Sequence, residues 1–218
     1  MNQDRRTRRA FLGETGAALA LLSSTLSAGE ALTPTPRQST GPYYPSSLPL
    51  DADNDLVEVR GSDRRAAGIV THVAGRVIDA RGRPIRGARV EIWQCNAFGR
   101  YHHPRDTRDA PVDPYFQGYG RSVTGDDGLY RFRTIKPVAY PGRTPHIHFS
   151  VSGEGFERLV TQMYVAGEPR NAGDVLLNRV RDARARARLV VALEPVPGAP
   201  GELSGRFDLV LETDAGRA

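Results

Sequence analysis

Residues 70–94 read VTHVAGRVIDARGRPIRGARVEIWQ. Apolar residues alternate with polar ones in both halves of this stretch, and Ala88, Val90 and Ile92 fall on one face of an extended chain. Between the halves lies a cluster of Asp, Gly and Pro at 79–84, which is typical of a tight turn. The stretch therefore predicts a strand-turn-strand unit with one buried face.

Similar short runs recur along the rest of the chain. Thr124–Arg133 contains an Asp-Gly turn, after which Tyr130 and Phe132 face opposite to Arg131 and Arg133. Further strands are expected at Ile147–Val151, Leu159–Val165, Leu189–Leu193 and Phe207–Leu211. Strands at this spacing favour an all-β fold, a sandwich or a barrel.

Composition supports one globular β domain. The 23 glycines and 16 prolines among 218 residues exceed the usual share of about 12% and favour many short elements with tight turns. A hydrophobic fraction of 39% can fill one core, and no apolar run approaches the ~20 residues that cross a bilayer. The segment 38–55 is too rich in Pro and Asp for a regular element. We therefore expect an N-terminal arm at 32–68 and a sandwich domain at 69–218.

The charge pattern does not indicate a nucleic-acid partner. The formal net charge is +5, and every basic residue except Lys136 is arginine. The arginines alternate with acidic residues over most of the chain, and no nucleic-acid recognition motif accompanies them. Arg179–Arg188, with five arginines, is expected to be a solvated helix or irregular segment. The single Cys95 excludes an internal disulfide.

The first 31 residues have the layout of an export signal. A basic stretch precedes an Ala/Leu-rich run at Ala17–Leu22 and the small residues 27–29. Within it, Thr7–Gly13 reads TRRAFLG and resembles a twin-arginine signal. The sequence therefore predicts export by the twin-arginine machinery to the periplasm or the exterior, with cleavage near Gly29 or Ala31. The alternative is a disordered basic tail.

A His-x-His motif is the first candidate for chemistry. His146, His148 and Ser150 fall on one face of the strand predicted around 147–151. Two strand steps separate the Cα atoms of the two histidines by ~6.6 Å, so both imidazoles can reach one metal ion. Two polar residues on the solvent face of an edge strand would give the same pattern, and the motif alone leaves both interpretations open.

Four ordered blocks of sequence give the motif a family context. They are Trp93–Tyr101, Thr124–Pro141, Arg143–Phe149 and Leu159–Tyr164. Together they resemble the intradiol ring-cleaving dioxygenases over about residues 38–212, most closely the iron-bearing, beta-type subunit of the protocatechuate 3,4-dioxygenases. The resemblance implies a β-sandwich of the prealbumin (transthyretin-like) Greek-key type with an extended N-terminal arm.

The resemblance also implies a non-haem Fe(III) site. Its four ligands would be Tyr101, Tyr140, His146 and His148, each the residue type that the family pattern requires. Hard Fe(III) suits anionic oxygen, and the charge of the cation can hold tyrosine as phenolate despite a reference pKa near 10. Two phenolates reduce the charge of the centre to +1, which makes it far less costly to bury than bare Fe(III).

The implied reaction inserts both atoms of O2 into a catechol and yields a cis,cis-muconate-type product. Tyr140 would leave the metal and take a substrate proton, Arg143 would stabilise carbanion-like density on the ring, and Gln162 would lie beside the iron. Three aromatic residues, Tyr43, Tyr44 and Trp93, would line the substrate pocket. Partners are the catechol-type substrate and O2, and the sequence leaves open a homo-oligomer or a related second subunit.

One loop departs from the family pattern. Only five residues separate Tyr140 from His146, and Gly142 stands where an aromatic residue is expected. A wider pocket and a different substrate are therefore expected.

Two other functions fit parts of the sequence. An iron-free β-sandwich could act as a binding module, although it would not need two tyrosines and two histidines in register. A different metal enzyme could use the two histidines with Asp126 or Asp127 to hold Fe(II) or zinc. Those aspartates are better explained as the turn residues of the Asp-Gly hairpin.

Overall fold

The computed structural model describes residues 31–49 and 51–213, so the predicted export signal lies outside the described residues except for Ala31. Strands dominate this part of the chain, which confirms the all-β class. The helical segments are short: η1 (Pro169–Gly173), α1 (Val175–Asn178) and α2 (Ala183–Ala187). Among the described residues no helix has the length and apolar character needed to span a membrane.

The first sheet is arranged around β1 (Val70–Asp79). One edge of β1 pairs with antiparallel β4 (Leu129–Ile135). Its other edge pairs with β9 (Leu203–Arg206) and then β10 (Leu209–Leu211), both parallel to it. The short β8 (Glu194–Pro195) adds an antiparallel edge to β9.

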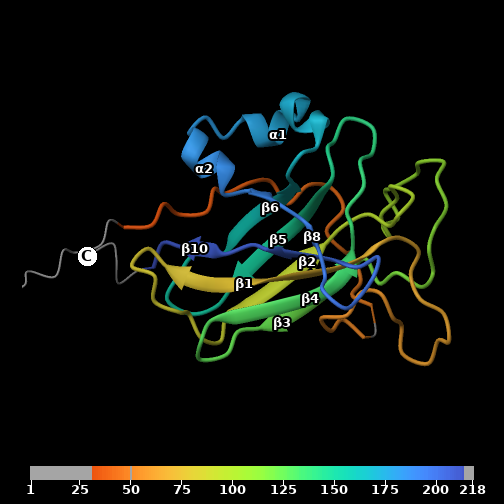
Figure 1. The fold of residues 1–218 in the computed structure, drawn as a ribbon, viewed down its shortest axis with the longest axis horizontal. Coiled ribbons are helices and arrows are strands. Elements are labelled where there is room, and N and C mark those ends of the chain that lie inside the picture. The colour runs from red at the N-terminus through yellow and green to blue at the C-terminus, as the bar shows by residue number, and fades with distance from the viewer. Residues whose placement is uncertain (1–30, 50, 214–218) are drawn as a thin grey trace, which may run out of the picture. The chain divides into compact units, whose positions relative to one another are not determined.

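The second sheet has the order β3-β2-β5-β6-β7. Its strands are β2 (Arg89–Trp93), β3 (Tyr119–Val123), β5 (His146–Ser152), β6 (Leu159–Val165) and β7 (Val190–Val191). All pairs are antiparallel except β6 with β7. Figure 1 shows β2, β5 and β6 side by side, and this sheet carries the His-x-His motif on β5.

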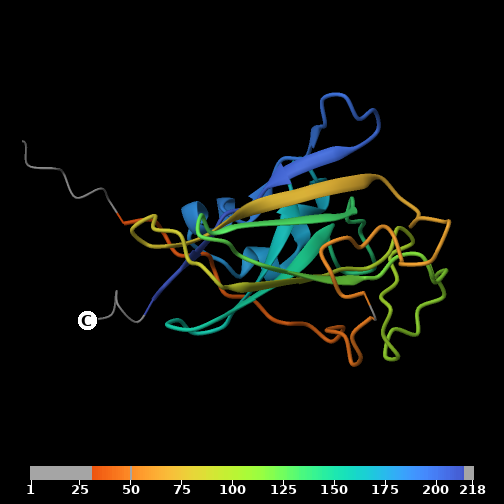
Figure 2. The ribbon, with the colours of Figure 1, turned by 90° about the horizontal axis from the view of Figure 1, so that it is seen from below.

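The two sheets pack face to face. In Figure 2, β1 (gold) lies above the sheet that contains β2. Phe149 of β5 lies between the layers, with its ring centroid 6.1 Å from that of Tyr130 on β4 and 5.0 Å from that of Phe207. Each such apolar side chain contributes roughly 1.5–3 kcal/mol when buried. The interior is therefore a hydrophobic core shared by both sheets, as the predicted sandwich requires.

The strand-turn-strand unit is present, but it does not form a hairpin. β1 and β2 belong to different sheets, so the turn at 79–84 carries the chain from one layer to the other. The Asp-Gly turn at 124–128 likewise connects β3 to β4 across the layers. Alternation shows that a strand has a buried face, but it does not identify the partner strand.

Three strands and one helical arrangement differ from the sequence prediction. The prediction lacks β3, β8 and β9, because YGRSV, EP and LSGR are short and contain few apolar residues. The basic segment 179–188 contains the short helix α2, and η1 and α1 precede it. Asp174 and Asp182 cap α1 and α2 by accepting two backbone N–H bonds each.

Residues 32–40 of the N-terminal arm are extended and lie along the sandwich, whereas the described residues of 41–68 form mainly turns and bends and add Leu56, Val57 and Ala66 to the core. The backbone N–H of Thr35 donates to Val210 O at 2.9 Å, and that of Gln38 donates to Val160 O at 2.7 Å. Further along, Gly41 has φ +70°, and a Cβ there would lie 3.3 Å from Cε1 of His148. A glycine is needed at this position because the backbone is left-handed and lies close to the imidazole.

Candidate metal centre

Two imidazoles occupy fixed places on β5. His146 and His148 are 1% and 2% exposed, and their ring centroids lie 4.9 Å apart. His148 pairs in register with Trp93 of β2, and the two rings stack at 4.8 Å with an interplanar angle of 8°. The edge-strand interpretation of His-x-His is therefore wrong, because β5 lies inside the sheet between β2 and β6.

The hydrogen bond of His146 defines its tautomer. Nδ1 of His146 lies 2.7 Å from the carbonyl oxygen of Thr144, which can only accept, so Nδ1 carries the proton. Burial, together with the nearby Arg143, lowers the pKa of His146 to about 3. The ring is therefore neutral at ordinary pH, and its Nε2 presents a free lone pair suited to a metal ion.

The loop between β2 and β3 holds Tyr101. Asn96, fully buried, accepts the N–H of Phe98 at 2.9 Å and of Arg100 at 3.0 Å, and donates to Pro111 O at 2.9 Å. These bonds shape the turn that delivers Tyr101, which is 3% exposed. The phenol is thus held by a side-chain network and not by a strand ladder.

Tyr140 begins a tight turn in the loop between β4 and β5. The N–H of Arg143 donates to Tyr140 O at 2.9 Å, Pro141 follows Tyr140, and Gly142 has φ +80°. These are the features of a type II turn, which favours Pro and Gly at its two central positions. The turn explains why the short loop carries glycine there, and it places Tyr140 and Arg143 close together.

The four predicted ligands converge. The hydroxyl oxygens of Tyr101 and Tyr140 lie 3.4 Å and 3.5 Å from Nε2 of His146. The Tyr101 ring lies 5.8 Å from Tyr140 and 6.3 Å from His148. Nδ1 of His148 is buried and lacks a hydrogen-bond partner among the described residues.

This donor set fits a trivalent cation. Burial raises the pKa of both phenols, that of Tyr101 strongly, and lowers the pKa of both imidazoles. Two phenols and two neutral imidazoles therefore meet in a buried place with no charge of their own. A bound cation would supply that charge and displace the phenolic protons, and hard Fe(III) matches the oxygen and imidazole donors.

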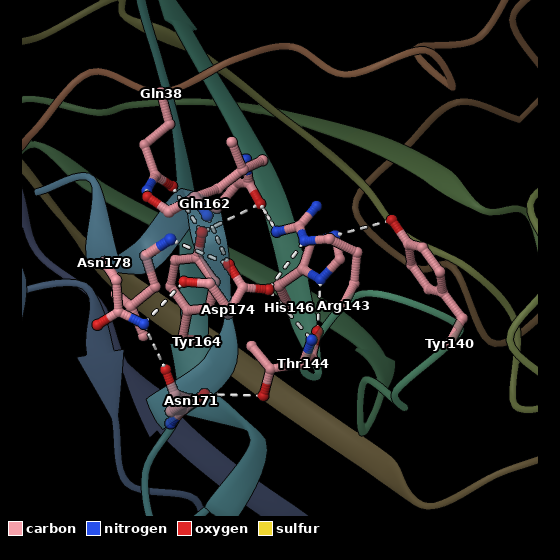
Figure 3. A network of polar contacts seen from close by, with 12 residues as sticks. Gln38, Tyr140, Arg143, Thr144, His146, Gln162, Tyr164, Asn171, Asp174 and Asn178 are labelled. Atoms are coloured by element: carbon pink, nitrogen blue, oxygen red, sulfur yellow. Dashed lines mark hydrogen bonds and ion pairs between the residues drawn. The ribbon is translucent and has the colours of Figure 1, made fainter.

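Figure 3 shows Arg143 close to His146 and held from two sides, by Asp174 and by Gln162. Its Nε donates to Asp174 Oδ2 at 2.9 Å, and its Nη2 donates to Gln162 Oε1 at 2.5 Å. The Asp174 side chain has no exposed surface, and it also accepts the N–H of Thr144 at 3.2 Å. Gln162, also buried, donates to Ser39 O of the arm at 3.3 Å.

Two of the three predicted pocket residues contact candidate ligands, Tyr43 on Tyr101 and Trp93 on His148, whereas Tyr44 lies one layer further out against Trp93. Tyr43 stacks on Tyr101 at 4.7 Å, and Tyr44 packs edge-on against Trp93 at 5.0 Å. The Tyr44 hydroxyl donates to the buried Glu91 at 3.0 Å. The arm therefore contributes Tyr43 to the site directly and Tyr44 as support behind Trp93.

Two cavities adjoin the tyrosines of the site, one beside each. A cavity of about 220 Å³ is bordered by Tyr43 and Tyr101, and one of about 310 Å³ is bordered by Tyr140, Gly142 and Arg143. A Cβ at Gly142 would meet no atom within 4 Å. The second cavity therefore has free space where an aromatic residue was expected from the family pattern.

The histidine–aspartate metal site is not supported. Asp126 pairs with Arg86 at 2.7 Å with 82% of its side chain exposed, and Asp127 accepts the N–H of Leu129 within the turn. Throughout residues 31–49 and 51–213, no group of three His, Cys, Asp or Glu side chains could hold a metal ion.

Sequence reasoning missed two buried aspartates of the site, Asp106 and Asp174. Each pairs with an arginine, Arg108 and Arg143 respectively. Asp174 stands before a helix, and its N-cap position was the available signal. Asp106 lies in an irregular loop where no sequence pattern marks burial.

Comparison with known proteins agrees with this geometry. Residues 39–213 match the sequence profile of a protein family described as Dioxygenase. The chain belongs to the intradiol ring-cleavage dioxygenases. This family uses non-haem Fe(III), and the iron-free binding module is accordingly not favoured.

Individual relatives of this dioxygenase support the assignment. It is 45% identical over 172 residues to the protocatechuate 3,4-dioxygenase beta chain of Burkholderia cepacia, covering 75% of this chain and 72% of the relative. It is 37% identical over 157 residues to hydroxyquinol 1,2-dioxygenase of Rhizobium sp., covering 62% of this chain but 49% of that one. The dioxygenase domain of a dioxygenase–carbohydrate-binding fusion from Streptomyces sp. SirexAA-E superposes with a TM-score of 0.64 at 32% identity, covering 83% of this chain and 99% of the other.

Proposed function

We propose that this dioxygenase binds one Fe(III) through Tyr101, Tyr140, His146 and His148 and cleaves a catechol between its two hydroxyl-bearing carbons with O2. The product is of the cis,cis-muconate type. One observation carries the proposal: the phenol oxygens of the buried Tyr101 and the half-buried Tyr140 lie 3.4 Å and 3.5 Å from the unprotonated Nε2 of His146. A hydrogen-bonded core cluster would not need all four of these donors.

The residues around the proposed iron site have separate roles in the reaction. Ferric iron, when bound, supplies the charge that keeps both tyrosines as phenolates and draws electron density from a coordinated catechol. Oη of Tyr140 is placed to accept a proton from a substrate hydroxyl, because Tyr140 is half-buried and borders the 310 Å³ cavity. The guanidinium of Arg143 borders the same cavity and stabilises negative charge that develops on the ring.

The substrate class follows from the relatives together with the cavity. The named relatives are protocatechuate, hydroxyquinol and catechol dioxygenases, so the proposed substrate is a 1,2-dihydroxybenzene. The open space at Gly142 leaves room for a ring substituent. The beta-chain relative supports assembly with a related second subunit. Turnover by the chain purified alone, measured together with its mass in solution, tests whether that partner is needed.

A visible absorption spectrum with iron quantified on the same sample tests the function. We expect a broad tyrosinate-to-iron charge-transfer band that moves when catechol or protocatechuate is added without oxygen. Tyr101→Phe and Tyr140→Phe should each change the band. A protein that stays colourless after ferric loading would overturn the proposal.

We also propose that residues 1–31 direct export by the twin-arginine machinery. The support is the TRRAFLG motif followed by an apolar run and small residues. Replacing Arg8 and Arg9 by lysine keeps the charge but removes the arginine pair. We expect the full chain to reach the periplasm and the double variant to stay inside. Equal export of both would contradict a twin-arginine signal.

A further inference from the structure

A second arginine, Arg108, packs against the two tyrosines of the proposed iron site, Tyr101 and Tyr140. The guanidinium carbon of Arg108 is 4.2 Å from the ring centroid of Tyr140, 5.4 Å from that of Tyr43 and 5.9 Å from that of Tyr101. A guanidinium within about 6 Å of an aromatic ring is attracted by its electron-rich face. One cation therefore contacts both candidate phenol ligands and the arm.

A buried carboxylate fixes this arginine in place. Asp106 Oδ1 accepts from Arg108 Nε at 2.7 Å, and Oδ2 accepts from Arg108 Nη2, which makes a two-point ion pair. Oδ2 also accepts the backbone N–H of Tyr101 at 2.7 Å. The Asp106 side chain has no exposed surface. Asp106 therefore ties the backbone that carries Tyr101 to the cation that lies on Tyr140.

The remaining edge of the guanidinium has no conventional partner. Nη1 of Arg108 is buried and makes no hydrogen bond to any described residue. A structural arginine in a loop normally has its donors satisfied. Here Nη1 has no acceptor. Of the three contacts between the guanidinium and an aromatic ring, the one with Tyr140 is the shortest.

The Tyr140 ring is less enclosed than the Tyr101 ring. It lies at the start of a turn and is only half-buried, and its hydroxyl is 3.5 Å from Nε2 of His146. Its nearest ring contacts, to His146 and Tyr101, have centroid distances of 5.5 Å and 5.8 Å. Among the described ring and cation contacts of Tyr140, the one with Arg108 has the shortest distance to its centroid.

We infer that Arg108 is a positioning residue that holds the Tyr140 ring in the orientation that ligates iron, and that Asp106 couples this ring to Tyr101. The two phenols, although they lie in different loops, are thereby set as one unit. This inference rests on the proposed iron site. It concerns how two ligands are positioned and not which substrate is used.

Three variants test the inference in the iron-loaded protein. Arg108→Gln removes the cation, Arg108→Lys keeps a charge without the planar fork, and Asp106→Asn/Arg108→Gln removes both charges while leaving an acceptor for Tyr101 N–H. The control is Arg83→Gln, because Arg83 pairs with the buried Asp79 at 2.7 Å in the turn before β2, whereas the loop that carries Tyr101 follows the other end of β2. Iron retention against a chelator and the visible band are measured for each.

We expect roughly two- to thirty-fold weaker iron binding and a displaced charge-transfer band in all three site variants. Arg108→Lys should fail to restore the band, because an ammonium cannot pair at two points with Asp106 and also lie flat on the ring. Arg83→Gln should match the unaltered chain.

The outcomes separate this inference from the function. A colourless unaltered chain would overturn the proposed iron site itself. A coloured chain whose double variant keeps the same band and iron retention would overturn the positioning role alone. Full rescue by Arg108→Lys would likewise overturn it, since charge without geometry would then be sufficient.

Discussion

The histidine half of the proposed iron site lies in one strand, whereas the tyrosine half lies in two loops. His146 and His148 are placed by the register of β5 between β2 and β6. Tyr101 depends on Asn96 and Asp106, and Tyr140 depends on a type II turn. The imidazoles are thus fixed by backbone ladders that many residues share, and the phenols are fixed by a few side chains.

This difference teaches where the site can be adjusted. A shift of the β5 register by one residue would turn both imidazoles to the opposite face of the sheet. The histidine half of the site is therefore either correctly formed or lost. A loop can shift by fractions of an ångström without loss of the fold. We therefore expect abrupt losses from changes in the strand half and graded losses from changes in the loop half.

The largest effect is expected for His148→Ala. A ligand from the rigid half cannot be replaced by movement of its neighbours, so iron binding should weaken by more than the roughly 100-fold that changes to supporting residues reach. Iron content after dialysis measures this. Ser150→Ala, two residues along the same face of β5, is the control and should keep its iron. Comparable iron loss in both variants would mean that the strand, not the imidazole, was damaged.

A smaller, graded effect is expected for Asn96→Ala. The change removes three hydrogen bonds that shape the Tyr101 loop, so iron binding should fall by about 10- to 100-fold while β5 stays intact. Chelator competition gives the affinity. The control is Asn54→Ala, which removes a hydrogen bond to Arg131 O of β4. An unchanged affinity for Asn96→Ala would show that the phenol half is as rigid as the strand half.

Asp174→Asn should lower kcat about tenfold and leave the resting visible band unchanged. Its carboxylate holds Arg143, and a hydrogen bond to a charged group is worth about 1.5–3 kcal/mol. Asp182→Asn is a matched control, because Asp182 caps α2 with the same two-bond pattern but pairs with no arginine of the site. Equal kinetic losses would reduce the role of Asp174 to helix capping.

The Asp174 carboxyl also leads to a prediction about how stability depends on pH. Burial opposes ionisation of Asp174, but hydrogen bonds from Leu177 N–H and Arg143 outweigh it and hold its pKa below the usual value. A depressed pKa in the folded state contributes stability that is present above about pH 4 and is lost as pH falls through the folded value. Acid unfolding curves should therefore show a shallower loss of stability for Asp174→Asn below about pH 4. Parallel curves would contradict this.

The smallest effect is expected for Gly142→Ala. A side chain at φ +80° strains the turn by about 1 kcal/mol, although it meets no neighbour. Gly167→Ala, at φ +76° in a turn outside the site and equally unobstructed, should lower the free energy of unfolding by the same amount. Only Gly142→Ala should also shift the visible band. A shift in neither variant would show that the turn does not control Tyr140.

The sequence predicted the strand half of the site better than the loop half. The alternation around His146 and His148 placed both imidazoles on one face of a strand, and the structure confirms that placement. No periodicity could place Tyr101 or Tyr140, which were predicted only through a family resemblance. Asp106 and Arg108 were not predicted, because a contact between loop residues depends on the folded arrangement of the chain and leaves no local sequence pattern.

The fold was likewise predicted in part: strands were identified, but their pairing was not. Alternation found β1, β2 and β5, whose buried faces form the core. It could not show that β1 and β2 lie in different sheets, since pairing is decided by partners distant in sequence. β9 contains Gly205, where a Cβ would lie 2.7 Å from Leu193, so this strand is defined by close packing and not by apolar residues.

The parallel pairing of β1 with β9 and β10 constrains how the chain is made. Thr71 pairs with Leu203 and Val77 with Leu209, so one edge of β1 has no partner until the ribosome has added the intervening segment. At ordinary elongation rates this takes on the order of ten seconds. During that time the nascent chain presents an open strand edge, which is a template for association with other chains. Aggregation during synthesis is therefore expected to begin at this edge of β1.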